Sequence, residues 1–99
     1  MERIAFDEGN DDKKYLVIYD IEVNKRRTKL AKMLESYGIR VQYSAFELML
    51  NDVKYKKMLK ELISIIDLTD NIRIYQLDRE GMRFVYGDTE EKYCDLIII

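Results

Sequence analysis

The chain has 99 residues, enough for one domain with a modest core, and 36% of them are charged although the formal net charge is only -2. It contains no histidine, which excludes Ser-His-Asp and Cys-His nucleophile systems and metal sites ligated by histidine. The single cysteine, Cys94, excludes an intrachain disulfide, and without a signal peptide or an apolar run of about 20 residues we expect a soluble, cytoplasmic protein with no membrane segment.

The charges are distributed unevenly along the chain. Residues 1–12 carry five acids against one arginine, and we expect them to form an acidic tail. Residues 13–40 carry eight lysines and arginines against three acids. A basic block in an acidic chain marks a candidate surface for binding anions. Residues 13–99 are expected to form a single domain.

The first predicted elements are a strand and a helix. Residues 14–21 are nearly all apolar or aromatic, which predicts a central strand that is buried on both faces and ends at Asp20. The spacing of leucines predicts a helix over residues 25–37. Asn24 is expected to cap its start, and Gly38 is expected to end it in a left-handed conformation.

The middle of the chain predicts further strands and a second helix. Residues 40–50 are rich in β-forming types, and they fit either one long bulged strand or two strands that meet near Tyr43. A second amphipathic helix is predicted to run to about Ile66, with either Asn51 or Asp52 as its cap.

The last third of the chain predicts β structure only. Residues 71–77 alternate as a half-buried strand does, a turn follows at 78–81, and residues 83–86 form a short strand. The apolar end, residues 94–99, fits a strand that pairs either with its own sheet or across a two-fold dimer, and the second is favoured. The predicted fold is therefore an α+β, ferredoxin-like βαββαβ sandwich with an extra C-terminal strand.

Asp20 is the leading candidate for chemistry. A carboxylate at the end of a central strand lies at a sheet edge where ligands commonly bind. Mg²⁺ needs only one or two carboxylates, with water and phosphate oxygens as its other ligands. The alternative is an aspartate that only forms the turn after the strand. Glu22 is a possible second ligand.

Four basic residues lie near the same end of the strand or on the helix beside it: Arg26, Arg27, Lys29 and Arg40. They are candidates for binding the phosphates of a nucleic acid. The alternative is a solvated helix face, which for Lys29 and Lys32 taken individually is the better explanation. The concentration of charge in one segment makes the two interpretations about equal.

Three motifs together carry a family resemblance. Tyr-Asp-Ile ends the first strand at 19–21, two arginines follow at 26–27, and Arg-Val-Gln-Tyr-Ser-Ala-Phe-Glu occupies 40–47. This combination resembles the CRISPR-associated protein two family, and the match extends over about residues 15–77. The Gln-Tyr-Ser-x-Phe-Glu stretch at 42–47 is its most specific part.

The resemblance implies a ferredoxin-like homodimer that acts in spacer acquisition, bound to a CRISPR integrase subunit and to the DNA to be inserted. It also implies a Mg²⁺- or Mn²⁺-dependent endonuclease acting on single-stranded RNA or double-stranded DNA. The metal-binding and catalytic residue of the family falls on Asp20. Tyr19, Arg27, Arg40 and Phe46 fall on positions where the family commonly carries the same residue types, and we expect them to bind nucleic acid.

Three other functions fit the same sequence. The first is a scaffold that binds DNA without cleaving it. The second is a toxin-type messenger-RNA endonuclease on the same fold, similar to the virulence-associated protein D group. The third is a ferredoxin-like regulatory domain that senses a small molecule.

Overall fold

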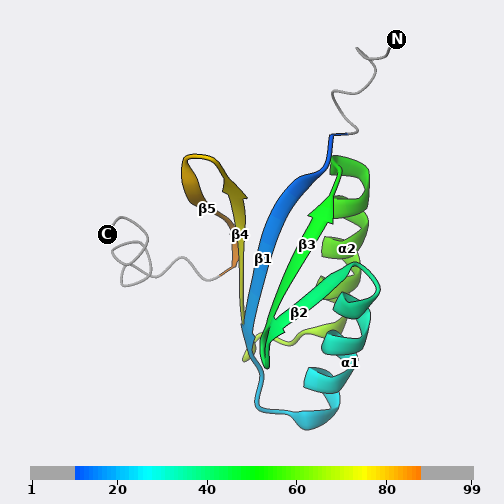
Figure 1. The fold of residues 1–99 in the computed structure, drawn as a ribbon. Coiled ribbons are helices and arrows are strands. Elements are labelled where there is room, and N and C mark those ends of the chain that lie inside the picture. Colours follow the sequence, from blue (N-terminus) through cyan, green and yellow to red (C-terminus); the bar gives the residue numbers. More distant parts are fainter. Residues whose placement is uncertain (1–10, 88–99) are drawn as a thin grey trace.

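The described chain, residues 11–87 of a computed structural model, follows the predicted order of elements. Its strands form one antiparallel sheet in the order β2-β3-β1-β4-β5, and two helices cover one face of that sheet (Figure 1). The predicted ferredoxin-like fold is confirmed, with β5 as the additional strand. The elements are β1 (Lys13–Asp20), α1 (Asn24–Glu35), β2 (Gly38–Gln42), β3 (Ala45–Leu50), α2 (Asp52–Ile65), β4 (Asn71–Asp78) and β5 (Gly81–Gly87).

Two predicted segments lie outside the described residues. They are most of the acidic tail, residues 1–10, and the apolar segment 94–99. The division into a tail and one domain therefore stays a prediction.

β1 is the central strand, paired with β3 on one side and β4 on the other. Tyr15, Val17 and Tyr19 point toward the helices and are buried. Leu16 and Ile18 point the other way and are only half-buried, because no element within residues 11–87 covers that side. The predicted burial of this strand on both faces is therefore wrong for the second face.

We call this second side the open sheet face. It consists of the alternate strand residues that point away from the helices, and the pairing register identifies them. Those used below are Leu16, Ile18, Asp20, Met49 and Arg73.

The sequence predicts Asn24 as the cap of the first helix and either Asn51 or Asp52 as the cap of the second, and the structure has an asparagine cap on α2 only. Asn51 is the N-cap of α2, and its side chain accepts a 2.8 Å hydrogen bond from the Lys54 amide. The N-cap of α1 is Val23, whose side chain cannot cap. Asn24 lies inside the first turn, where its Oδ1 accepts a 2.6 Å bond from Arg27. Asn24 therefore holds a side chain instead of capping the backbone.

Gly38 does not end α1 in the predicted way. The helix already ends at Glu35, and Gly38 is not among the described glycines with positive φ. Gly38 begins β2, and a Cβ atom there would lie 2.1 Å from the carbonyl oxygen of Glu47 in β3. Glycine is needed because the two strands approach closely, and not because the backbone is left-handed.

The segment that fitted one or two strands forms two. β2 and β3 are joined by a turn at Tyr43 and Ser44. A 3.1 Å hydrogen bond from the Tyr19 amide to the Ser44 carbonyl holds this turn against the end of β1. The β2–β3 ladder shifts register between Arg40 and Gln42, so β2 also carries a bulge.

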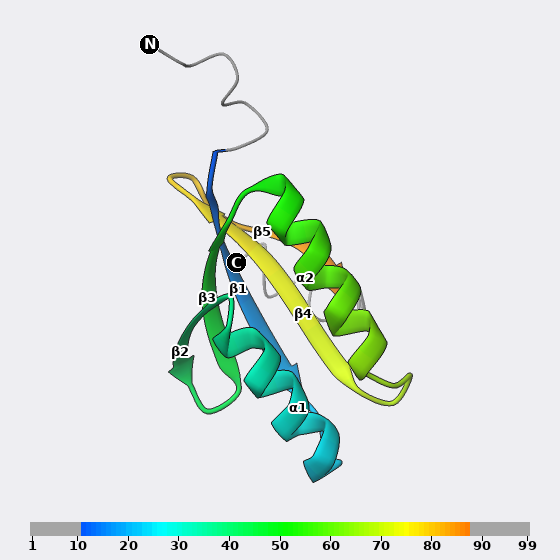
Figure 2. The same cartoon turned by 90° about the vertical axis from the view of Figure 1, so that its right-hand side faces the viewer.

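The hydrophobic core lies between the helices and the sheet, and Figure 2 shows both helices lying across one face. The hydroxyl of Tyr37, just after α1, donates a 3.0 Å bond to Glu61 of α2 and links the helices. In the described part of the chain, neither helix has the length and apolar character needed to cross a membrane. The fully buried side chains include Val17, Leu30, Leu34, Phe46, Leu48, Met58, Leu62 and Ile74.

Candidate functional site

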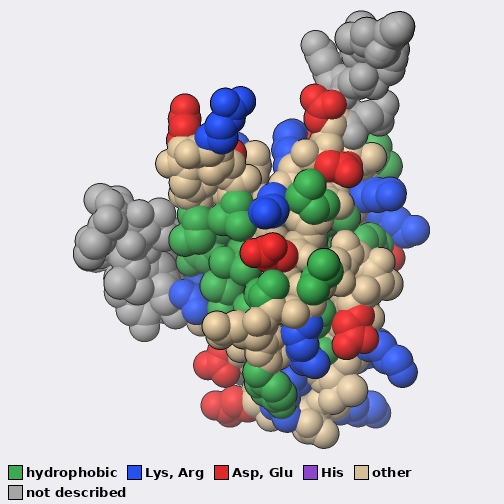
Figure 3. All heavy atoms as spheres, viewed as in Figure 1, with side chains coloured by type: hydrophobic (Ala, Val, Ile, Leu, Met, Phe, Trp, Pro, Cys, Tyr) green, Lys and Arg blue, Asp and Glu red, His purple; other side chains and the backbone are tan. Residues whose placement is uncertain are grey.

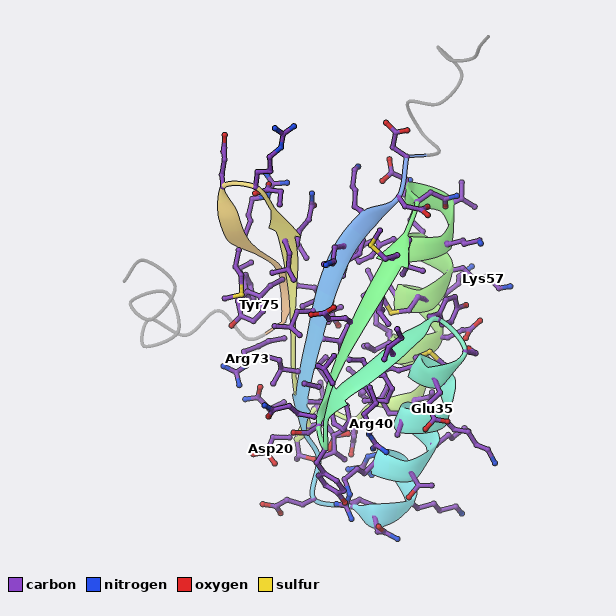
Figure 4. All side chains as sticks on the ribbon, viewed as in Figure 1. Asp20, Glu35, Arg40, Lys57, Arg73 and Tyr75 are labelled. Atoms are coloured by element: carbon purple, nitrogen blue, oxygen red, sulfur yellow. The ribbon has the colours of Figure 1, made fainter. Side chains whose placement is uncertain are left out.

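Asp20 ends β1 as an exposed residue on the open sheet face, opposite Asn71 of β4. It lines a cleft of about 330 Å³ whose other walls include Arg27, Tyr43 and Arg73. We call this the Asp20 cleft. Figure 4 shows Asp20 and Arg73 on the same side of the sheet. The predicted accessible carboxylate at the strand end is therefore present, and it has cationic neighbours.

A second cleft, of about 310 Å³, contains Asp20 together with Glu22 and Asp70. Within residues 11–87, no group of three or more cysteine, aspartate or glutamate side chains is close enough to hold a metal ion. One chain thus offers Asp20, with Glu22 nearby. This donor set fits a hard cation such as Mg²⁺, which takes one or two carboxylates and fills its remaining positions with water or phosphate oxygens.

Arg26 forms a bidentate ion pair with Asp70. Its Nε and Nη2 atoms donate to the two carboxylate oxygens at 2.8 and 3.0 Å. The Asp70 side chain is 2% exposed and also accepts a 2.8 Å bond from the Asp67 amide. The hydrogen bonds from Arg26 lower the pKa of Asp70, and the same contact raises the pKa of Arg26. Asp70 is therefore not available to a metal.

The role predicted for Arg26 needs correction. The sequence assigns it to phosphate binding, but its guanidinium is already paired with a carboxylate of the loop between α2 and β4. Because the partner is 44 positions away in the sequence, no local pattern indicates this pairing. Arg26 holds the loop beside Asp20 in place.

Arg27 connects the loop after β1 to α1. Its Nη1 donates to the Ile21 carbonyl at 2.8 Å, and its Nη2 donates to Asn24. Arg27 also lines the Asp20 cleft. Arg27 is therefore held by the loop and also borders the candidate site.

Arg40 lines a cleft between β2 and α1, which we call the Arg40 cleft. This cleft measures about 370 Å³, and its walls include Arg27, Lys32, Tyr43 and one acid, Glu35. Figure 4 shows Arg40 and Glu35 at the side of the sheet next to α1. Three cationic side chains against one carboxylate favour an anionic ligand here.

Tyr19 and Phe46 belong to the core. Their exposed fractions are 2% and 0%, which leaves no room for the direct nucleic acid contact that the resemblance implies. The Arg40 guanidinium lies over the Phe46 ring, with 5.3 Å between Cζ and the ring centroid. It also donates a long, 3.5 Å bond to the Tyr19 hydroxyl. Both aromatic residues therefore support Arg40 from beneath.

Comparison with known families agrees with this geometry. A family model described as CRISPR associated protein Cas2 matches residues 13–83. The chain belongs to the Cas2 family. The resemblance found in the sequence is confirmed, and its limits, about residues 15–77, lie within the matched region.

Two Cas2 relatives give the degree of similarity. A Mycobacterium tuberculosis (strain H37Rv) protein named CRISPR-associated endoribonuclease Cas2 is 48% identical over 72 residues, covering 73% of this chain and 64% of the relative. A Rhodospirillum rubrum protein named CRISPR-associated endoribonuclease Cas2 4 is 46% identical over 63 residues, covering 63% and 51%. The chain therefore spans about half to two thirds of the length of these relatives.

Solved structures show the same fold. The crystal structure of Streptococcus pyogenes Cas2 is 36% identical, with a TM-score of 0.63 over 67% of this chain and 87% of that chain. A hypothetical protein from Thermus thermophilus is also 36% identical, with a TM-score of 0.67 over 81% of this chain and 99% of that chain.

Three residues of the site were not predicted: Lys32, Tyr43 and Arg73. Lys32 lines the Arg40 cleft, whereas Lys29, which was predicted, is exposed on α1 away from the walls of both clefts. Nucleic acid binding by Lys29 stays a prediction. Arg73 could have been assigned to a sheet face from the alternation of its strand. Its position near Asp20 also required the β1–β4 register.

Proposed function

We propose that the chain is a homodimeric, nucleic-acid-binding subunit of CRISPR adaptation that hydrolyses phosphodiester bonds with Mg²⁺ or Mn²⁺ bound at Asp20. Membership of the Cas2 family supports the CRISPR role, and relatives named as endoribonucleases support the reaction. The observation that carries the proposal is the exposed Asp20 in one cleft with Arg27 and Arg73. In such a site the carboxylate can bind the metal ion while the neighbouring arginines bind the phosphate of the substrate.

The open sheet face supports the homodimer. Figure 3 shows apolar side chains gathered between the β4–β5 hairpin and β1. Met49 is 55% exposed, and Leu16 and Ile18 are half-buried. Stacking two copies across a two-fold axis would remove this surface from water. Because Asp20 lies on the same face, the axis would bring two Asp20 carboxylates toward one metal ion.

Each residue of the site has a separate task in this proposal. Asp20 holds the divalent ion, which when bound lowers the pKa of a water ligand and polarises a phosphate oxygen. Arg40 and Lys32 attract the phosphates of the substrate. Arg27 fixes the loop that follows Asp20, because its guanidinium binds the Ile21 carbonyl.

We also propose the partners of the chain. The basic clefts suit double-stranded DNA or single-stranded RNA in the cytoplasm, and a CRISPR integrase subunit is the protein partner that the family role requires. These assignments rest on the family and on the charge of the two clefts.

A DNA-binding scaffold without catalysis is the second candidate. One observation favours it: within the described residues, no group of three or more acidic or cysteine side chains lies close enough together to hold a metal ion. The scaffold keeps the basic clefts and the dimer, and it gives Asp20 no catalytic task.

The test compares wild-type protein with Asp20→Asn and with the matched control Asp12→Asn, an exposed aspartate just before β1. Each protein is incubated with labelled duplex DNA or single-stranded RNA, in Mg²⁺, in Mn²⁺ or in chelator. Binding of Mn²⁺ is measured separately by calorimetry, and circular dichroism monitors the fold. We expect Asp20→Asn to lose cleavage and metal binding, with both retained in Asp12→Asn.

Cleavage by Asp20→Asn at the wild-type rate would refute the catalytic proposal. Duplex binding without cleavage under any condition would replace it with the scaffold. Absence of binding to both substrates would overturn both candidates.

A further inference from the structure

Tyr43 is the most exposed aromatic side chain of the site, and its backbone is anchored. The ring is 71% exposed at the turn between β2 and β3. The Tyr43 carbonyl accepts a 3.4 Å bond from the buried Tyr19 hydroxyl. The next carbonyl, of Ser44, accepts the 3.1 Å bond from the Tyr19 amide. An apolar ring is therefore presented to water from a turn that the core holds at two points.

One side of the Tyr43 ring carries a cation, and the remainder faces solvent. The Arg40 guanidinium carbon lies 5.5 Å from the ring centroid, within the range of a cation–π contact. Arg40 is itself positioned by the Phe46 ring beneath it. Tyr43 and Arg40 thus form a preassembled surface with an aromatic part and a cationic part.

Tyr43 also stands where the two clefts meet. It lines the Arg40 cleft, with Lys32 on the opposite helix, and it lines the Asp20 cleft. Glu35 is the acid among the walls of the Arg40 cleft, so the cations there outnumber it. A chain of phosphates lying in the Arg40 cleft would pass over the Tyr43 ring toward Asp20.

We infer that Tyr43 is a stacking platform for one unpaired base of single-stranded nucleic acid, with the adjoining phosphates on Arg40 and Lys32. An aromatic ring beside a basic groove is the arrangement by which proteins bind single strands. A base inside a duplex has both faces stacked on its neighbours, so it cannot use the ring. The inference rests on the nucleic acid binding in the proposed function, and it is independent of cleavage.

The first experiment measures affinity by fluorescence anisotropy in chelator, which removes metal-dependent cleavage. Short single-stranded RNA, single-stranded DNA of the same sequence, and the corresponding DNA duplex are titrated with wild-type protein, Tyr43→Ala and Tyr43→Phe. We expect Tyr43→Ala to bind both single strands about 5- to 100-fold more weakly, the range for loss of one stacked base, with duplex affinity nearly unchanged. Tyr43→Phe should bind like wild type.

A matched pair of lysines tests the phosphate contact. Lys32 and Lys57 are both exposed helix residues, but Lys57 lies on α2, away from the clefts (Figure 4). Lys32→Gln should weaken single-strand binding and make it less dependent on salt, because one phosphate contact is lost. Lys57→Gln removes the same charge and should change neither quantity.

The second readout reports stacking of the base directly, independently of affinity. A single-stranded oligonucleotide that carries 2-aminopurine should lose fluorescence on binding wild-type protein and not on binding Tyr43→Ala at saturation, because stacking on the ring quenches the base.

Equal single-strand affinity of Tyr43→Ala and wild type would overturn the inference. Equal weakening on single strands and duplex would also overturn it, as would unquenched 2-aminopurine in the wild-type complex. If wild type binds duplex only, the inference fails and the proposed DNA binding stands. If single strands bind through Tyr43 and remain uncleaved in Mg²⁺ and Mn²⁺, the inference stands and the proposed catalysis fails.

Discussion

Arg26 and Asp70 join the first turn of α1 to the loop before β4 by two parallel hydrogen bonds, across 44 positions of sequence. This pair lines the cleft behind Asp20. The ion pair therefore holds one side of the candidate site in place without a bound ligand.

The Arg26–Asp70 pair should make the stability of the protein sensitive to acid. Arg26 lowers the pKa of Asp70 from its ordinary value of 3.8, so the contribution is fully present above that value and is lost as pH falls through the lower folded value. In urea titrations at neutral pH (about 7), Asp70→Asn should unfold at a lower urea midpoint than wild type. As the pH is lowered, the midpoint of Asp70→Asn should fall less steeply than that of wild type. The control Asp12→Asn should follow wild type. Parallel curves for Asp70→Asn and wild type would contradict the assignment.

The two helix-start asparagines should differ in their effect on stability. Asn51→Ala removes the side chain that accepts from the Lys54 amide, and we expect a loss of about 1 kcal/mol. Asn24→Ala removes no cap, so its cost should stay within about 0.5 kcal/mol. Chemical denaturation of the two variants gives both values. Equal losses would mean that Asn24 also caps its helix in solution.

Phe46→Leu should separate packing from nucleic acid contact. Because Phe46 is wholly buried, we expect the variant to lose roughly 1 kcal/mol of unfolding free energy and to remain folded. Its affinity for nucleic acid should fall only a few-fold, through the weakened support of Arg40. Arg40→Gln should show the reverse pattern, with little change in stability and an affinity about 10-fold lower. A large loss of affinity in a fully stable Phe46→Leu protein would instead support direct contact between Phe46 and the nucleic acid.

A lysine on the open sheet face should disrupt the proposed dimer. Met49 on that face and Ile63 on α2 are similarly exposed, at 55% and 50%. Met49→Lys should convert the protein to a monomer, whereas Ile63→Lys should remain dimeric, as measured by light scattering after gel filtration. A dimer that survives Met49→Lys and dissociates with Ile63→Lys would move the interface to the helical face.

Most of the fold was predictable from local patterns. Helix α2 follows from its apolar spacing and from Asn51, and Asp20 was found because the apolar run that precedes it stops there. Two local signals misled. Asn24 is a typical cap residue, but here its side chain binds Arg27. Gly38 is a typical helix stop, but here it is needed because β3 lies too close for a Cβ atom.

The site was less predictable because its contacts are long-range. Arg26 is of a residue type that often binds phosphate, but the tertiary structure pairs it with the carboxylate of Asp70. Tyr19 and Phe46 match a functional motif, yet their alternation in β1 and β3 turns them inward. The role of Tyr43 depends on a turn whose existence the sequence left undecided.

The bulge in β2 also bears on self-assembly. Within residues 11–87, β2 lies at one edge of the sheet, and its Ile39 and Val41 are exposed apolar side chains. A straight edge of this composition offers a row of backbone donors and acceptors to any passing strand. The register shift between Arg40 and Gln42 interrupts that row at Val41. A bulge on an edge strand hinders this kind of pairing, so we expect the irregularity in β2 to reduce edge-to-edge association in concentrated protein.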